Sequence, residues 1–504
     1  MSLMAKPQLE AAKKVPSQVI DAIFKASRSE GRSSTTAEQN DNCAEKAPEA
    51  SGLSKPELVQ CNPDIVDWDG PNDPAYPRNW HRRKKGMHVA LISAFTLCAN
   101  MLTTIFAPGA GSLAKEFGIA SPIIVSLTVS VYLLGFAFGP LFLAPLSEIY
   151  GRRIIYHISN AVFASGCASS APMTIGGGSI ADMFKDEERG SAMAAWSIGP
   201  MLGPCAGPVI GGFVTSTIGW RWTFWLLLIL AGVFDTIALF LMKETFEPVL
   251  LERKTAQLRK LTGNPNLRAR TSGSDHPPLH SLLRSIIRPT KMLFLSPIVS
   301  LLSTYTAFVF GLIYLLFATF PQVFGDTYHF DFGIAGLVYL GTGVGMVSGL
   351  IFFAATSDRL VKKLQNGAKT CPEARLIMMV FVAPLLPIGF FWYGWSVDKG
   401  AHWIVPILGT YFVGLACFGI ILPVMNYLVD AFDAGAAASA LAASTVLRSL
   451  FGALLPLAGP PIYSRLGLGW GNSLLAFVGL LFVPIPWVFY RNGQALREKY
   501  VINL

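Results

Sequence analysis

Eleven long apolar runs constrain this chain more than any other feature of its sequence. They are residues 88–107, 122–146, 154–184, 191–213, 220–242, 297–320, 334–355, 376–395, 403–427, 434–462 and 473–490. A helix needs about 20 apolar residues to cross the hydrocarbon core of a membrane, and each run approaches or exceeds that length. Charged residues make up 14% of the chain, against about 25% in soluble domains. We therefore predict an all-α polytopic membrane protein.

Basic residues lie between the apolar runs, where cytoplasmic loops carry them. One cluster fills residues 81–85, a second lies in the central segment 244–296, and a third lies in the tail 491–504. We therefore expect both termini in the cytoplasm. The loops account for the net charge of +9, so nucleic acid is not an expected partner.

The runs divide the chain into five segments. Residues 1–80 are polar and lack the apolar core of a signal peptide, which predicts a disordered cytoplasmic tail. We expect a first helical bundle over 81–243, a basic cytoplasmic loop over 244–296 and a six-helix second bundle over 297–490. A cytoplasmic tail over 491–504 completes the chain.

Neither an enzyme nor a metal site is indicated. The seven cysteines are scattered and form no Cys-x-x-Cys pair, which argues against a disulfide framework and a zinc site. The sequence has no His/acid cluster and no nucleophile elbow. Three consecutive glycines, 176–178, lie within an apolar run, which favours helix packing over phosphate binding. We expect no cofactor.

A short pattern at the end of the second run recurs in the second half of the chain. In both halves a glycine precedes a Ser-acid pair by the same spacing, and basic residues follow. The residues are Gly139, Glu148, Gly151, Arg152 and Arg153, and then Gly349, Asp358 and Arg359. Internal repetition is typical of secondary transporters. We interpret the charges as a gate that locks two helices in one conformation; the alternative is a loop that only sets topology.

The run 191–213 contains glycines and prolines at a spacing of four. They are Gly199, Pro200, Gly203, Pro204, Gly207, Pro208, Gly211 and Gly212. This period keeps the glycines along one stripe of a helix, where a neighbouring helix can approach closely. The prolines remove backbone donors and bend the helix. The pattern predicts a helix at the interface of two moving halves.

Together these motifs resemble the fungal drug:proton antiporters of the major facilitator superfamily, in their normally twelve-span branch. The similarity extends from residues 66–71 to 484–487, most of the chain. Residues 139–153 are similar to the family's cytoplasmic gating motif, and 199–212 to its antiporter motif, which marks exporters. The resemblance implies two pseudo-symmetric helical bundles and protons as the coupling ion.

The run 154–184 departs from this family. The resemblance places two spans and a loop here, but two crossings need about 40 residues plus a turn, and the run has 31. A single crossing would put the basic central loop outside the cell, against the charge rule. We therefore expect a truncated third and fourth span, joined near Phe163 and Ala164, through a skipped exon or a real loss. The missing part includes an arginine that the resemblance implicates in proton coupling.

Charged residues within spans are functional candidates. Asp235 could carry a proton, or it could face water near the cytoplasmic end of its span. Arg448 could line a cavity or join helices. Four further candidates for a cavity, for which ordinary packing is the alternative, are Asn100, Tyr305, Tyr314 and Asn426.

We predict a monomeric exporter in the lipid bilayer of the plasma membrane rather than the vacuolar membrane. Its substrates would be small organic compounds such as drugs, toxins or secondary metabolites, moved by alternating access. One alternative is an exporter of polyamines or other cations, which would need more acidic residues in its spans than Asp235. Another is a truncated membrane protein that does not transport.

Overall fold

The computed structural model describes residues 64–70, 72–161, 170–271, 278–365, 372–432 and 434–499. All of them belong to one compact unit, Cys61–Leu504. Residues 1–63, most of the predicted tail, lie outside the described residues. In the described part, helices dominate and the strands are two short pieces, β1 (Ile65–Val66) and β2 (Arg268–Ala269), which pair in parallel.

The first half contains α3 to α10 and two short 3-10 turns. These elements are η1 (Pro77–Asn79), α3 (Arg82–Leu102), η2 (Ala107–Gly109), α4 (Ala110–Glu116), α5 (Pro122–Ser130), α6 (Tyr132–Tyr150), α7 (Arg152–Ala161), α8 (Ala171–Met183), α9 (Asp186–Thr217) and α10 (Arg221–Leu241). Two helices, α11 (Glu247–Thr262) and α12 (Pro278–Leu295), link the halves. The central segment expected as a loop is therefore largely helical.

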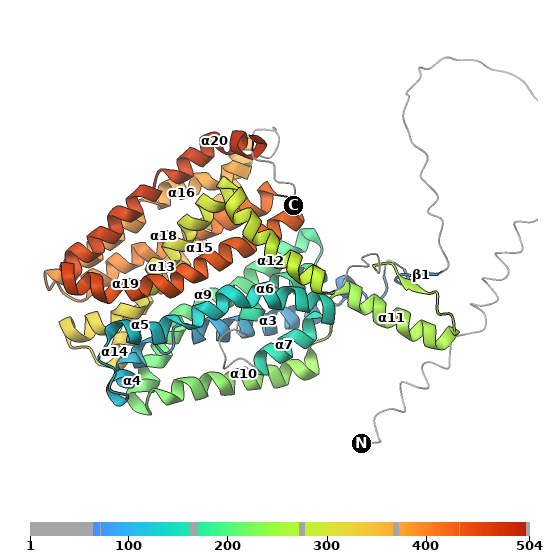
Figure 1. Ribbon diagram of the computed structural model, residues 1–504, viewed down its shortest axis with the longest axis horizontal. Coiled ribbons are helices and arrows are strands. Elements are labelled where there is room, and N and C mark those ends of the chain that lie inside the picture. Colours follow the sequence, from blue (N-terminus) through green and yellow to red (C-terminus); the bar gives the residue numbers. More distant parts are fainter. Residues whose placement is uncertain are drawn as a thin grey trace, which may run out of the picture. The chain divides into compact units, whose positions relative to one another are not determined.

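The second half contains α13 to α20. These elements are α13 (Pro297–Tyr328), α14 (Phe332–Leu337), α15 (Tyr339–Gln365), η5 (Pro372–Leu376), α16 (Ile377–Val382), α17 (Leu385–Asp398), α18 (Ile404–Ala431), α19 (Ala434–Phe482) and α20 (Ile485–Lys499). The long helices of both halves run side by side in Figure 1, with α4 and α14 toward one end and α7 and α11 toward the other.

Among the described residues, nine helical stretches are long and apolar enough to cross a membrane. The last one, Ser439–Arg497, contains the two final apolar runs. The chain reverses near Gly467, which has a positive φ of 73°. Thr306 of α13 contacts Ser444, and its neighbour Tyr305 stacks on Phe482. The segments of α19 before and after Gly467 therefore both lie beside the same part of α13, so α19 consists of two helical segments that pass α13 one after the other.

The truncated region forms a short hairpin. α7 has 10 residues and α8 has 13, so at 1.5 Å per residue they are about 15 and 20 Å long. Neither crosses a hydrocarbon core of about 30 Å. Arg152 contacts Asp182, and one turn deeper Tyr156 contacts Ser179. The two helices are therefore antiparallel and return to the face they leave.

This hairpin resolves the conflict between the short length of the run 154–184 and the expected side of the basic central segment. A pair of half-length helices makes no full crossing, so the basic segment that follows α10 stays on the same face as the start of α3. The predicted shortening agrees with these lengths. The predicted joint at Phe163 and Ala164 lies outside the described residues, in the gap at 162–169.

Large apolar side chains cover much of the outer surface of the helices. Phe240 is 83% exposed, Leu481 75% and Ile229 55%. In water such exposure would be costly, since burying one side chain of this size is worth about 1.5–3 kcal/mol. In a bilayer the same side chains contact lipid. The surface thus agrees with a multi-pass membrane protein.

Candidate transport pathway and gating site

Five titratable side chains, four of them acids or bases that carry charge at neutral pH, gather where the first-half helices end on one face, which we call the charged face. They are Lys85, His88, Arg152, Asp182 and Glu244, all buried or half-buried. His88 Nε2 accepts a hydrogen bond of 3.0 Å from the backbone N–H of Lys243. The start of α3 and the end of α10 are thereby joined at this face.

Arg152 is the centre of the charged face. Its Nη1 donates to Ser147 Oγ at 2.5 Å, its Nε lies 3.4 Å from Asp182 Oδ2, and its guanidinium lies 4.7 Å from the ring of Phe246. Glu148 is farther away, at 4.0 Å, and its side chain is 58% exposed. An exposed pair of this kind contributes little. The principal acidic partner of Arg152 is therefore Asp182.

Glu244 fixes the turn between α6 and α7. Its carboxylate accepts four backbone hydrogen bonds of 2.9–3.1 Å, two from the start of α7 (Arg152 and Arg153) and two from Thr245 and Phe246. Gly151 has a φ of 97°, and a side chain there would overlap the carboxylate. The predicted Gly151 is thus required by geometry, because Glu244 occupies the space beside it.

The other residues of the repeated pattern are placed less closely together. Gly139 is buried in α6, and Arg153 donates from its exposed side chain to the carbonyl of Leu239 at 2.9 Å. In the second half, an added methyl at Gly349 would lie 2.6 Å from the carbonyl of Leu415, so α15 and α18 pack closely. The side chains of Asp358 and Arg359 lie outside the described residues, although their backbone belongs to α15.

The glycine stripe of α9 packs against α3 and the turn that follows it. Added methyl groups at four glycines would overlap this segment. The overlaps pair Gly199 with Ser93, Gly203 with Asn100, Gly207 with Thr104, and Gly211 with Ile105. Pro200, Pro204 and Pro208 lie inside the helix. The spacing of four therefore matches a continuous close contact within the first half.

A second side of α9 faces the other half of the molecule. An added methyl at Gly212 would lie 2.5 Å from the carbonyl of Phe332, and one at Gly336 would lie 2.6 Å from the carbonyl of Pro208. Phe332 and Gly336, both in α14, therefore lie against the backbone of α9. The glycine-proline segment thus joins α3 to α14, at the end of the helices away from the charged face.

A buried polar chain crosses between the halves near the middle of the helices. Thr103 Oγ1 donates to the carbonyl of Asn100 at 2.7 Å, so it accepts from the hydroxyl of Tyr314, 2.9 Å away. Asn100 lies in the last turn of α3 and Thr103 directly follows that helix, whereas Tyr314 belongs to α13. Arg448 of α19 is buried nearby and lies 5.0 Å from the ring of Phe310.

Asp235 has two partners on α7. Its Oδ1 lies 2.8 Å from His157 Nδ1 and accepts a hydrogen bond of 2.9 Å from Asn160 Nδ2. The side chains of Asp235 and His157 are 21% and 17% exposed. His157 Nε2 is buried and has no hydrogen-bond partner among the described residues, which leave out 162–169. The structure therefore places Asp235 in a small polar cluster between α10 and α7.

Two other predicted residues lie apart from this chain of contacts. Tyr305 is fully buried in the core of the second half and stacks on Phe482 with ring centroids 5.3 Å apart. Asn426 is half-buried on α18. The contacts of Tyr305 are those of a packing residue.

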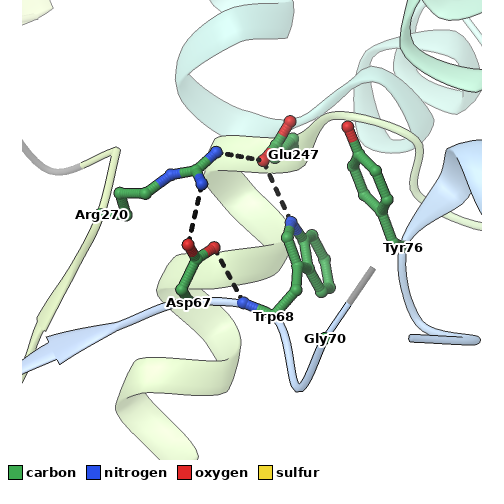
Figure 2. Close-up of a pocket in the computed structure, with 6 residues that line it drawn as sticks. All are labelled: Asp67, Trp68, Gly70, Tyr76, Glu247 and Arg270. Atoms are coloured by element: carbon green, nitrogen blue, oxygen red, sulfur yellow. Dashed lines mark hydrogen bonds and ion pairs between the residues drawn. The ribbon is translucent and has the colours of Figure 1, made fainter. Parts of the chain in front are cut away.

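A pocket of about 370 Å³ lies between the segment before α3 and the linker (Figure 2). Arg270 reaches Asp67 at 2.8 Å and Glu247 at 3.5 Å, and the indole N–H of Trp68 donates to Glu247 at 3.0 Å. We call these residues, with Gly70 and Tyr76 that complete the lining, the clasp. Residues 64–70 and 72–80, predicted as part of a disordered tail, thus belong to the folded region.

Asp73 anchors the segment between the clasp and α3. It accepts from the backbone N–H groups of Ala75 at 2.8 Å and Asp69 at 3.1 Å, and Lys254 lies 3.7 Å away. Burial raises the pKa of this carboxyl, but the two backbone hydrogen bonds and Lys254 outweigh it, so the pKa is below its ordinary value.

Sequence reasoning missed Glu244, Asp182, His157, Asn160 and Thr103. Two of these residues could be noticed in the sequence. Glu244 lies two residues after the apolar run 220–242, and Asp182 lies near the end of the run 154–184. Their partners, however, lie 92 and 30 residues away. The sequence alone does not show that these distant positions meet.

A family model described as the Major Facilitator Superfamily matches residues 91–456. The MFS transporter prlG of Fungal sp. (strain NRRL 50135) is 58% identical and is covered completely, with 90% of this chain aligned. A trichosetin biosynthesis cluster MFS transporter of Gibberella fujikuroi is 46% identical, with 88% of this chain and 91% of that protein aligned.

The prlG alignment also bears on the short hairpin. It extends over 472 positions but covers 90% of this chain, about 454 of 504 residues. About 18 aligned positions therefore have no residue here, roughly the length of one span. The relative prlG therefore contains residues that this chain lacks.

Among solved structures, the inward-open xylose transporter XylE from E. coli superposes with a TM-score of 0.60 at 16% identity. The match covers 80% of this chain and 96% of that chain. At this identity the likeness concerns the fold. The family model matches well over half of the chain and the fungal relatives match nearly all of it, so this chain belongs to the Major Facilitator Superfamily of membrane transporters.

Proposed function

We propose that this protein exports small organic compounds by alternating access, in which two bundles rock around a central site. The observation that carries the proposal is the packing of α9. Its glycines contact α3 within one bundle, while Gly212 and Pro208 contact α14 of the other. A smooth, proline-bent helix at this position lets the halves separate and close without side chains that would block the movement.

We propose that the charged face is cytoplasmic, since basic loop segments accumulate there. Both termini are then in the cytoplasm and the membrane is the plasma membrane. Arg152, Asp182 and Glu148 act there as a gate with their counterparts in the second half. The contacts between α9 and α14 close the outer side in this conformation.

Protons are the proposed coupling ion. Asp235 is the acid in a span that can exchange one, and His157 beside it offers a second group that accepts a proton. The 2.8 Å contact between His157 Nδ1 and Asp235 Oδ1 is short enough for a proton to pass between the two groups. Because the arginine implied by the family resemblance falls in the shortened region, this pair would take over the coupling.

The names of the relatives favour compounds that the cell makes itself. One relative is a trichosetin biosynthesis cluster transporter. We propose that this protein exports a secondary metabolite, and that drugs or toxins of similar size and apolar character share the pathway. The lipid bilayer is its solvent, and one chain is the functional unit.

Expression in a yeast strain that lacks its own efflux pumps tests this proposal. We expect resistance to an apolar drug, and loss of that resistance in Gly212→Val. Resistance to spermine alone would instead indicate an exporter of cations. A matched chain carrying the extra residues of prlG between Phe163 and Ala164 is the control for the shortened hairpin. Resistance only with this restored chain, at equal surface expression, would mean that the shortened protein does not transport.

A further inference from the structure

Arg448 lies where the two halves of the molecule meet. One turn further along α19, an added methyl at Gly452 would lie 3.0 Å from both Leu133 of α6 and Phe310 of α13. Arg448 itself is 6% exposed. Its guanidinium is therefore enclosed by helices of both halves.

Arg448 has at least one hydrogen-bond donor without a partner among the described residues. An arginine carries five N–H donors and keeps its charge in proteins. In the described part of the chain, nothing accepts a hydrogen bond from the buried Nε of Arg448. Among the residues whose side chains are described, no carboxylate lies within ion-pair distance of it. Burial of an unpaired charge is unfavourable, so this position calls for a negative partner.

The neighbours of Arg448 do not supply that charge. The hydroxyl proton of Tyr314 goes to Thr103, whose own proton goes to the carbonyl of Asn100. These groups are neutral, and their donors are already used. Asp235, the acid of the first bundle's last helix, is bound to His157 and Asn160 instead. The described residues around Arg448 therefore supply no negative group to balance its charge.

We infer that Arg448 binds the acidic group of the transported compound, so that the substrates are organic anions with an apolar body. The planar guanidinium fits a carboxylate with two parallel hydrogen bonds. The ring of Phe310 lies 5.0 Å from it and offers an apolar surface for the rest of the molecule. This inference rests on the proposed function, because it names the compounds that the same pathway carries.

Two other uses of Arg448 fit the contacts less well. A structural arginine would place its donors on backbone carbonyls or carboxylates, but the Nε of Arg448 bonds to neither. A site for polyamines or other cations would place like charges together, which is unfavourable. An anionic ligand satisfies both the charge and the free donors.

Binding of matched fluorescent probes to the purified full-length protein tests the inference. The probes are 4-(1-pyrenyl)butyrate, its neutral amide and 4-(1-pyrenyl)butylamine, which share one apolar body. The variants are Arg448→Gln, Arg448→Lys and, as a control on the same helix, the exposed Arg465→Gln. Size-exclusion profiles establish that each variant is folded.

We expect the wild type and Arg465→Gln to bind the butyrate at least tenfold more tightly than the amide or the amine. Arg448→Gln should lose this preference, and Arg448→Lys should retain part of it, because an ammonium keeps the charge but not the planar fork. Equal affinity of the wild type for all three probes would overturn the inference, even if the glutamine variant does not fold. So would an unchanged preference in a folded Arg448→Gln.

The result is separable from that of the proposed function. If the wild type prefers the butyrate through Arg448 but confers no resistance in cells, the export proposal fails and the binding site stands. If Arg448→Gln still confers resistance to a neutral drug but does not export the butyrate, both stand. If both compounds are exported equally by Arg448→Gln, export stands and the anion site fails.

Discussion

Replacing Glu244 by glutamine should destabilise the junction of α6, α7 and α10. Oε1 accepts three backbone hydrogen bonds, from Arg152, Thr245 and Phe246, and Oε2 accepts one from Arg153. A glutamine keeps one oxygen, but its NH₂ group then points at the N–H of Arg153, donor against donor. The negative charge beside the start of α7, where the helix dipole favours it, is lost as well.

The size of the effect follows from these contacts. A hydrogen bond to a charged group contributes about 1.5–3 kcal/mol, and a neutral one about 0.5–1.5 kcal/mol. One bond is lost and three become weaker, and Glu244 is buried at 5% exposure. We expect the free energy of unfolding to fall by about 2–4 kcal/mol, since hydrogen bonds in one cluster do not add fully.

Thermal denaturation of the purified protein, followed by the loss of the monodisperse size-exclusion peak, measures this change. The control is Glu252→Gln, an exposed position on α11, which should melt as the wild type does. Glu244→Asp should lie between the two, because it keeps the charge on a shorter side chain. If Glu244→Gln melts at the same temperature as Glu252→Gln, Glu244 does not hold this junction.

Three further changes test other parts of the structure. Gly212→Val should abolish transport but leave the protein in the membrane, because the valine would force α9 from α14; transport and surface labelling measure this. Asp235→Asn breaks the pair with His157 and should make export independent of the pH gradient, as measured in vesicles. Asp73→Asn should lower the melting temperature at pH 7. Because folding lowers the pKa of Asp73, its carboxylate adds to the free energy of unfolding above about pH 4. This contribution is lost as the pH falls through the folded pKa. The variant should then melt at the same temperature as the wild type.

For each of the three substitutions, one experimental result would contradict the reasoning behind it. Full transport by Gly212→Val would mean that α9 and α14 need no close contact. An unaltered dependence on the gradient in Asp235→Asn would exclude this acid as the proton carrier. A difference between Asp73→Asn and the wild type that stays constant as the pH is lowered until the protein unfolds would show that its effect is not one of charge.

The features that sequence predicted well are local ones. The glycine spacing of 199–212 fixes which side of one helix is smooth, so the close packing of α9 follows from the pattern itself. The length of the run 154–184 can be read directly from the sequence, and 31 residues are too few for two membrane crossings. The structure adds that the short helices pair as a hairpin, through Arg152 with Asp182.

The features that sequence missed depend on contacts between distant segments. The repeated pattern groups Glu148 with Arg152 in one gate, but Asp182 makes the closer contact with Arg152 from α8. Arg448 was visible as a charge in a span, whereas the absence of a carboxylate beside it, among the side chains that are described, appears only once the neighbouring helices are in place. The folded state of residues 64–80 likewise depends on Glu247 and Arg270 in the linker.

Transport into inverted plasma-membrane vesicles tests the central claim, proton-driven export, most directly. In such vesicles the cytoplasmic face points outward, so an exporter accumulates its substrate inside. We predict that vesicles with an acidic lumen accumulate 4-(1-pyrenyl)butyrate, and that collapse of the pH gradient or the Gly212→Val substitution abolishes this uptake. Uptake by the folded wild-type protein that equals uptake by vesicles without it, at every imposed gradient, would contradict the account.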